Sequence, residues 1–185
     1  AKFLKLNRGL EIVHNADLPA RSGLGSSSTF TVGLLNTLHA LQNYIPTKRE
    51  LALEAIHIEQ DLIKECVGSQ DQTAAAFGGL NKIVFSGEKK IEVDPIIISE
   101  ERLYELQDNL MLFFTGFARD ASEVAKLQIE VTPQKEKELH EMKEICYESL
   151  NRLTNRKESL QKFGELLNEQ WKIKRSITSK ISNND

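Results

Sequence analysis

The segment PARSGLGSSSTF, residues 19–30, constrains the chain most, because two glycines and three consecutive serines stand directly ahead of an apolar stretch. Glycine loses more backbone entropy on ordering than any other residue, and serine competes with the helix backbone for hydrogen bonds. A glycine-rich loop that runs into a helix leaves backbone N–H groups free at the positive end of the helix dipole. The segment therefore predicts an anion site at a helix start, and an ordinary serine N-cap remains the alternative.

The same loop carries side chains that suit a phosphate. Gly23 and Gly25 let the backbone approach closely, and the hydroxyls of Ser26, Ser27 and Ser28 can donate to phosphate oxygens or bind Mg²⁺. The segment is not a P-loop, because no lysine followed by serine or threonine comes after the last glycine. The prediction of a phosphate site therefore depends on the loop and the helix start alone.

Glu59 lies in a segment whose apolar residues recur at helical spacing. At about 100° per residue, its neighbours three and four positions away are all apolar: Ala55, Ile56, Leu62 and Ile63. The solvated face carries polar residues instead: His57, Asp61, Lys64 and Glu65. We therefore expect a buried carboxylate, which is costly unless it is paired or bound to a metal. Two interpretations stay open: a structural pairing with a buried arginine or backbone donors, and a metal-binding or catalytic role.

A further polar pair opens a short alanine-rich helix within GSQDQTAAAFGG, residues 68–79. Asp71 and Gln72 stand at its start, between Gly68 and the later pair of glycines. Small residues here allow another backbone or a ligand to approach closely. Asp71 either caps this helix or faces a ligand, and the spacing alone favours neither.

The other patterns predict an α+β chain. Strands are expected at 10–20, where Pro19 ends an alternating run, at two segments up to Pro95 joined by a turn at Ser86-Gly87, and at the apolar segment 109–116. Helices are expected from Ser26 or Ser27 to about Asn43, from a capping box of Thr47 and Glu50 to Gly68, and near 120–130, 133–152 and 157–180. The change from strands to helices predicts a boundary near residues 95–108.

Charge and composition argue against a nucleic-acid-binding protein, a membrane-spanning protein and a cysteine- or histidine-based metal site. The net charge of −3 provides no basic field for nucleic acid, and no apolar run approaches the roughly 18 residues that a membrane span needs. Cys66 and Cys146 lack metal-binding spacing and the four histidines form no cluster, so we expect reduced thiols and a cytoplasmic protein. The chain starts at Ala1 without a signal peptide and ends in SNND, so we expect a portion of a longer protein.

Taken together, these motifs resemble the GHMP kinases, a family that includes galactokinase, homoserine kinase and mevalonate kinase. The family pattern P-x-x-x-G-L-G-S-S is matched at all its fixed positions: Pro19, Gly23, Leu24, Gly25, Ser26 and Ser27. Glu59 stands twelve residues before the aspartate of a G-x-x-D-Q pattern, which is similar to the sugar-kinase branch. The segments VGSQDQTAAAFGGLNKIVFS, LFFTGFARDASEVAKLQ and GELLNEQWKIKRSIT resemble its heptose-phosphate kinases. The resemblance extends from about Leu10 to Ser182.

The resemblance implies roles for single residues. Those that would cradle the phosphates of ATP are Gly23, Leu24, Gly25, Ser26, Ser27 and Ser28. Ser27 and Glu59 would bind Mg²⁺, and Asp71 would accept the proton of the attacking sugar hydroxyl. The substrate-side candidates are Gln72, Thr115, Gly116, Arg119, Lys174 and Arg175. The three basic residues could neutralise a phosphate already on the sugar, and solvated cations at helix ends are the equal alternative for each.

The resemblance also implies an architecture and an activity. Residues 1–100 would be a ribosomal-protein-like part that binds ATP and Mg²⁺, and residues 101–185 a ferredoxin-like, helix-rich part. The family's N-terminal strand and its late Gly-Ala-Gly-Gly motif are not found, which again predicts a fragment. The implied activity is phosphorylation of a sugar or sugar phosphate. The first candidate for the phosphorylated group is the anomeric hydroxyl of a heptose 7-phosphate. The alternatives are a galactose-, fucose- or mevalonate-type kinase and a catalytically silent binding module. No nucleic-acid or membrane partner is expected, and the oligomeric state stays open.

Overall fold

The computed structural model of the chain describes residues 3–7, 9–17, 23–87, 90–113, 121–178 and 181–182, with the backbone alone at 121–124. The chain divides into two compact units, the first made of Ala1–Gly79 and Thr115–Ser122 and the second of Leu80–Phe114 and Glu123–Asp185. Within the described ranges, no helix combines the length and the hydropathy needed to cross a bilayer. The assignment of residues 1–100 and 101–185 to two kinase parts remains a prediction.

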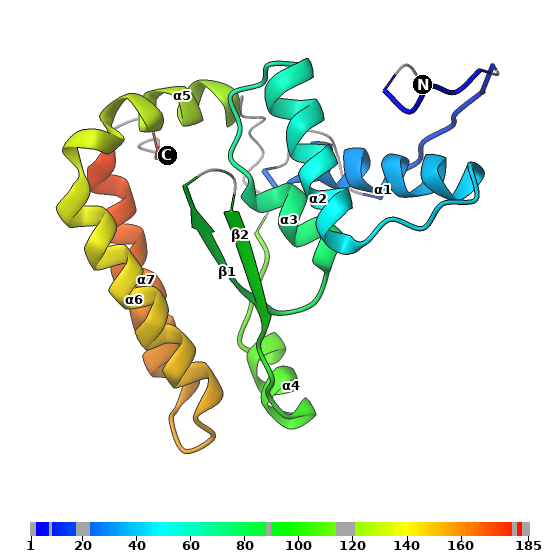
Figure 1. Ribbon diagram of the computed structural model, residues 1–185. Coiled ribbons are helices and arrows are strands. Elements are labelled where there is room, and N and C mark those ends of the chain that lie inside the picture. Colours follow the sequence, from blue (N-terminus) through cyan, green and yellow to red (C-terminus); the bar gives the residue numbers. More distant parts are fainter. Residues whose placement is uncertain are drawn as a thin grey trace. The chain divides into compact units, whose positions relative to one another are not determined.

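Three helices pack against one another in the first unit: α1 (Ser26–Leu41), α2 (Lys48–Ile56) and α3 (Gln70–Phe77) (Figure 1). Their shared core consists of Val32, Leu35, Leu51 and Ala55, against which Leu4, Ile58, Ala75 and Ala76 pack. Alanines on α3 let it lie close to its neighbours, because they carry little side-chain volume. Apolar spacing thus predicted α1 and the capping box the start of α2, and the alanine-rich segment after Gly68 predicted α3.

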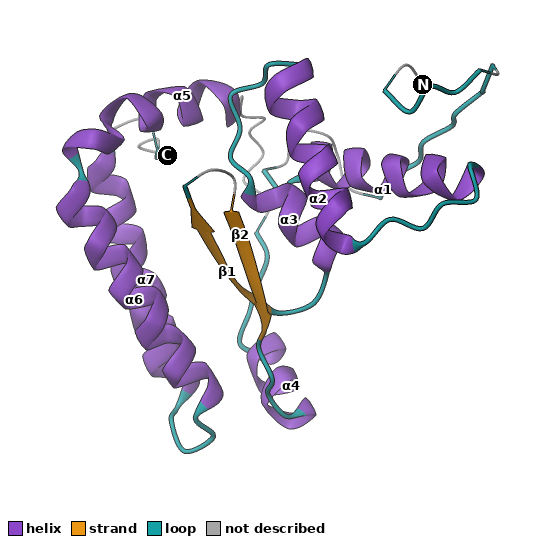
Figure 2. Cartoon of the chain, viewed as in Figure 1, coloured by secondary structure: helices purple, strands orange, loops and turns teal. Residues whose placement is uncertain are grey.

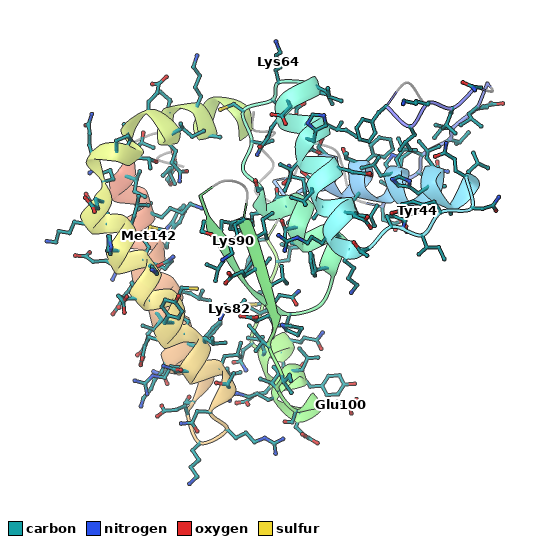
Figure 3. All side chains as sticks on the ribbon, viewed as in Figure 1. Tyr44, Lys64, Lys82, Lys90, Glu100 and Met142 are labelled. Carbon is teal, nitrogen blue, oxygen red and sulfur yellow. The ribbon has the colours of Figure 1, made fainter. Side chains whose placement is uncertain are left out.

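The start of α2 confirms the predicted capping box. Thr47 Oγ1 accepts a hydrogen bond from the backbone N–H of Glu50, and Glu50 Oε2 accepts one from the backbone N–H of Thr47 over 2.7 Å. Tyr44, labelled in Figure 3, donates its hydroxyl to the other oxygen of this carboxylate over 3.0 Å. The bond from the Thr47 backbone is the main reason why the pKa of Glu50 lies below its usual value.

The second unit begins with the predicted β-hairpin. Strands β1 (Asn81–Ser86) and β2 (Lys90–Pro95) are antiparallel (Figure 2), and the register pairs Lys82 with Asp94. These two opposite side chains form an ion pair at 2.6 Å, with Lys82 labelled in Figure 3, and this contact raises the pKa of Lys82. The hairpin and the helices around it confirm the α+β fold class.

Helices make up most of the remaining second unit: α4 (Glu100–Asp108), α5 (Ala121–Val131), α6 (Glu136–Thr154) and α7 (Leu160–Ile177). Pro133 lies in a short 3₁₀ turn, Thr132–Gln134, because its ring fits the first turn of a helix but not the interior. Helix α6 therefore begins later than the predicted residue 133. Helices α6 and α7 lie side by side, and their connection packs on α4 through Leu106, Leu153 and Leu160.

Arg102 of α4 fastens the connection between α6 and α7. Its side chain is 5% exposed, and its guanidinium donates to the carbonyls of Leu153 (3.1 Å), Arg152 (2.9 Å) and Glu158 (3.0 Å). The last carbonyls of a helix have no partner within the helix, so the guanidinium satisfies acceptors that would otherwise be orphaned. Glu105 pairs with the same group over 2.7 Å.

Arg102→Met is expected to lower the free energy of unfolding by about 3 kcal/mol, because it leaves buried carbonyls without donors. Urea unfolding followed by the fluorescence of Trp171, the single tryptophan and a residue of α7, measures the change. The matched control is the exposed Arg156, whose change to Met should alter the free energy by less than about 0.5 kcal/mol. Equal effects in the two variants would contradict the assigned role of Arg102.

Two predicted strands are wrong over the residues that the structure describes. Residues 10–17 and 109–113 form no strand, although both carry the expected apolar side chains. Val13 is 76% exposed and Met111 is 80% exposed. A strand exists only when its backbone pairs with a neighbour, and an alternating or apolar sequence does not supply that neighbour. Residues 18–20 and 114–116 of these predictions lie outside the described residues.

Candidate active site

The glycine-rich loop enters α1 without a serine cap. Gly25 is the N-cap residue, with φ = 67°, and no described side chain caps the backbone N–H groups of the first turn. Gly23 also has a positive φ, 76°, so both glycines adopt a conformation that other residues avoid. The serine N-cap alternative is therefore wrong. The N–H groups at the start of α1 are left without a side-chain cap, as an anion site requires.

Glu59 is buried as predicted, with 1% of its surface exposed. Its Oε2 accepts hydrogen bonds from Ser28 Oγ over 2.8 Å and from Gln72 Nε2, and its Oε1 accepts one from Thr31 Oγ1 over 2.9 Å. Among the described residues, three side-chain donors thus satisfy the carboxylate, and none of them is an arginine or a backbone N–H. Thr31 was not singled out from the sequence, although it lies one helical turn after Ser28 on the same face of α1.

A π-helical turn, His57–Leu62, sets the position of Glu59. The backbone N–H of Ile63 bonds to the carbonyl of Ile58 over 2.8 Å, five residues back, so the turn is wider than in an α-helix. The predicted helix ends here rather than at Gly68, and Lys64 (Figure 3) follows with φ = 61°. Because the angle per residue changes, Ile63 is 58% exposed instead of buried. Such turns are frequent at functional sites.

Asp71 lies against the glycine loop. It is an exposed residue in the first turn of α3, and a Cβ atom added at Gly25 would lie 3.1 Å from both Cγ and Oδ2 of Asp71. Ser69, not Asp71, is the N-cap residue of α3, so the capping interpretation of Asp71 is wrong. The first unit therefore brings the loop, Glu59 and Asp71 together.

Gln72 follows Asp71 in the sequence but is fully buried, whereas Asp71 is exposed. Its Nε2 donates to Glu59, and its Oε1 has no hydrogen-bond partner among the described residues. An unpaired buried acceptor costs about 1–3 kcal/mol, so such atoms are uncommon and call for an explanation. Gln72, named from the resemblance as a substrate residue, here contacts a carboxylate.

The carboxylate of Glu59 and the hydroxyl oxygens near it are of the ligand type that fits Mg²⁺. This ion prefers hard oxygen ligands and keeps several waters beside one or two carboxylates and substrate phosphates. Three hydrogen bonds leave Glu59 one of its roughly four acceptor positions. The hydroxyl that reaches this carboxylate is that of Ser28, whereas Ser27 is exposed. The described residues contain no group of three or more His, Cys, Asp or Glu side chains that could hold a metal.

The other predicted substrate residues are placed only in part. Thr115, Gly116 and Arg119 lie outside the described residues. Lys174 and Arg175 are exposed in the last turn of α7, in the second unit, where cations interact favourably with the helix dipole. A cavity of about 550 Å³ that the sequence did not predict lies beside α1 in the first unit and is lined mostly by apolar atoms, including those of Val13, Phe30 and Leu34.

The comparison with known protein families identifies the part of the chain that contains the glycine loop, Glu59 and Asp71. Residues 1–79 match the family described as the GHMP kinases N terminal domain. The chain carries a GHMP kinase N-terminal domain. That domain contains the glycine loop, Glu59 and Asp71, so every residue of the assembled site belongs to it.

Known proteins similar to the chain are sugar kinases. Over 175 residues it is 31% identical to the D-glycero-alpha-D-manno-heptose 7-phosphate kinase of Campylobacter jejuni, covering 92% of this chain and 50% of that protein. Over 112 residues it is 29% identical to the galactokinase of Pyrococcus furiosus, covering 60% of this chain and 30% of that protein. The structure resembles that of a D-glycero-D-manno-heptose 1-phosphate kinase from Bacteriodes thetaiotaomicron, with a TM-score of 0.69 and 27% identity over 86% of this chain and 46% of that one. The chain spans about half the length of the two heptose phosphate kinases.

Proposed function

We propose that the protein is an ATP-dependent kinase that phosphorylates a sugar hydroxyl, with the anomeric hydroxyl of a heptose 7-phosphate as its first candidate substrate. The observation that carries the proposal is the contact between Gly25 and Asp71 beside the uncapped start of α1. This arrangement puts a carboxylate next to backbone N–H groups that suit phosphate oxygens. The similarity to heptose phosphate kinases supports the choice of sugar.

In this proposal, Asp71 is the general base. A hydroxyl is a poor nucleophile near neutral pH, and a carboxylate beside it accepts its proton as the phosphoryl group moves. Asp71 is exposed and therefore accessible to a bound sugar, whereas Glu59 is buried. The two carboxylates thus have different tasks because their surroundings differ.

The loop and Glu59 hold the nucleotide end. The backbone N–H groups of Gly23, Gly25 and the serines that follow, with the hydroxyls of Ser26 and Ser27, donate hydrogen bonds to the phosphates of ATP and position the phosphoryl group for transfer, whereas the Ser28 hydroxyl donates to Glu59. Ser27 and Glu59 are the residues that hold Mg²⁺, which when bound neutralises charge on the phosphates. Charge neutralisation and positioning supply most of what phosphoryl transfer needs from a protein.

A substrate panel tests the proposal. The full-length protein is assayed with ATP and Mg²⁺ on heptose 7-phosphate, heptose 1-phosphate, galactose, fucose and mevalonate, and ³¹P NMR identifies the phosphorylated position. We expect kcat/KM for heptose 7-phosphate to exceed that for galactose by about 100-fold, because cations that bind a sugar phosphate lose their partner when the sugar lacks that group.

A preference for another substrate and the absence of turnover would each lead to a different conclusion. A preference for galactose or mevalonate would replace the proposed substrate and keep the kinase activity. The galactokinase similarity makes galactose the second candidate. No turnover on any substrate, together with no ATP-dependent shift in melting temperature, would instead identify a catalytically silent module on this scaffold.

A further inference from the structure

The side-chain amide of Gln72 donates a hydrogen bond to the buried carboxylate of Glu59, while its own oxygen is unsatisfied among the described residues. Its Nε2 donates to Glu59 Oε2, and its buried Oε1 has no partner in the part of the chain that the structure describes. A carboxylate oxygen only accepts hydrogen bonds, so the amide must present its nitrogen to Glu59 and cannot be rotated to relieve Oε1. An apolar side chain of similar length would avoid the unsatisfied oxygen but would leave the buried carboxylate of Glu59 one donor short, so the amide serves Glu59 at a cost to its own oxygen.

The bond from Gln72 closes a connection between three elements of the first unit. Glu59 of the π-helical turn is held from α1 by Ser28 and Thr31, and from α3 by Gln72. Asp71 is the preceding residue in the same turn of α3 and lies against Gly25. The connection therefore fixes the helix turn that carries Asp71 relative to the loop that precedes α1.

We propose that Gln72 is a positioning residue, which acts through Glu59 to hold Asp71 at the glycine loop. This inference rests on the proposed kinase function, in which Asp71 is the base. Gln72 is fully buried whereas Asp71 is exposed, so Gln72 is shielded from a bound sugar and exerts its effect on the angle and distance of its neighbour. Small displacements of a reacting group lower turnover strongly without a change in binding.

Gln72→Met in the full-length protein tests the proposal. It removes the donor to Glu59 and the unsatisfied oxygen, while the side-chain length stays similar. We expect kcat to fall by about 10- to 100-fold, with the KM values for ATP and sugar changed by less than about 2-fold. Gln170→Met is the matched control, because Gln170 Oε1 of α7 is also buried without a partner among the residues described, and it belongs to the other unit. Its kcat should equal that of the wild type.

A double-variant cycle shows whether Gln72 acts through Glu59. Gln72→Met is combined with Glu59→Met, which removes the acceptor at position 59, and kcat is measured for both single variants and the pair. If the proposal holds, Gln72→Met lowers kcat by less than about 2-fold in the Glu59→Met background, because the shared bond is already lost. Independent, multiplicative losses would overturn it.

Thr31→Val and the activity of the wild-type protein provide two further tests. Thr31→Val removes the donor to Glu59 from the α1 side at a partly buried residue, so it decides the matter if Gln72→Met fails to fold. Its kcat should fall by about 3- to 10-fold with unchanged KM values, by the same displacement argument. A wild-type kcat in the folded variants would overturn the role of Gln72 alone. An inactive wild-type protein without an ATP-dependent melting shift would overturn the kinase function and this role with it.

Discussion

Asp71→Asn is expected to lower kcat by about 10²- to 10⁴-fold, because an amide cannot accept the proton of the attacking hydroxyl. Asparagine has nearly the shape of aspartate, so the contact with Gly25 is retained and the loop keeps its conformation. The affinity for ATP should therefore change by less than about 3-fold, since Asp71 acts on the sugar and not on the phosphates. Stopped assays for kcat and isothermal titration calorimetry for the nucleotide measure the two quantities.

The control is Asp61→Asn, at an exposed carboxylate of the same unit that pairs with His57 over 2.7 Å. It should leave kcat within about 2-fold of the wild type, because exposed ion pairs contribute little. Retained turnover in Asp71→Asn would remove Asp71 from the role of base. A parallel loss of ATP affinity would show that the substitution disturbs the loop.

Gly25→Ala is expected to lower kcat/KM by at least about 100-fold, because it moves the two groups that the site brings together. The added Cβ would lie 3.1 Å from Asp71 Cγ, which is closer than such atoms normally approach. The residue also has φ = 67°, where an L side chain costs about 1–2 kcal/mol. Both effects act at the start of α1, so ATP affinity should fall as well as kcat.

Two other glycines separate the strain from the collision. Gly23 has φ = 76°, but a Cβ added there would meet no atom of the described residues within 4 Å, so Gly23→Ala tests strain alone and should cost about 10-fold in kcat/KM. Gly33 lies inside α1 with open space around it, and Gly33→Ala should be active and more stable by about 0.5–1 kcal/mol. Equal activity of the three variants would show that the contact between Gly25 and Asp71 is not required.

Local sequence predicted the parts of the fold that local physics controls. Apolar spacing placed α1, and the alanine-rich segment between glycines placed α3. Thr47 and Glu50 marked the start of α2, and turn residues at Ser86-Gly87 marked the hairpin. In each case the stabilising contacts lie within a few residues of one another. The strands expected at 10–17 and 109–113 depended on partners far along the chain, and neither forms in the described structure.

The sequence predicted the burial of Glu59 in the candidate site but not the residues that donate hydrogen bonds to it. The burial of Glu59 followed from Ala55 and Ile56, which precede it in regular α-helical geometry. Its hydrogen-bond donors come from residues that a helical wheel of its own segment does not contain. The spacing of Ser28 and Thr31 on one face of α1 was the available signal, but a hydroxyl face indicates a partner without identifying it.

The position of Asp71 in the first turn of α3 leads to the same conclusion. A capping role for Asp71 was a reasonable local interpretation, yet Ser69 occupies that position. The close approach of Asp71 to Gly25 joins positions that are far apart in sequence. Only the packing of α1 on α3 reveals it, because no local pattern encodes that distance.

The widened turn at His57–Leu62 has a consequence for how this domain tolerates change. Such a turn accommodates one more residue than the regular helix, so Glu59 owes its orientation to the number of residues in the segment as well as to their identities. Substitutions that preserve this count leave the carboxylate aimed at its donors. A one-residue insertion or deletion rotates it toward solvent, so we expect length to be restricted in this segment more tightly than composition.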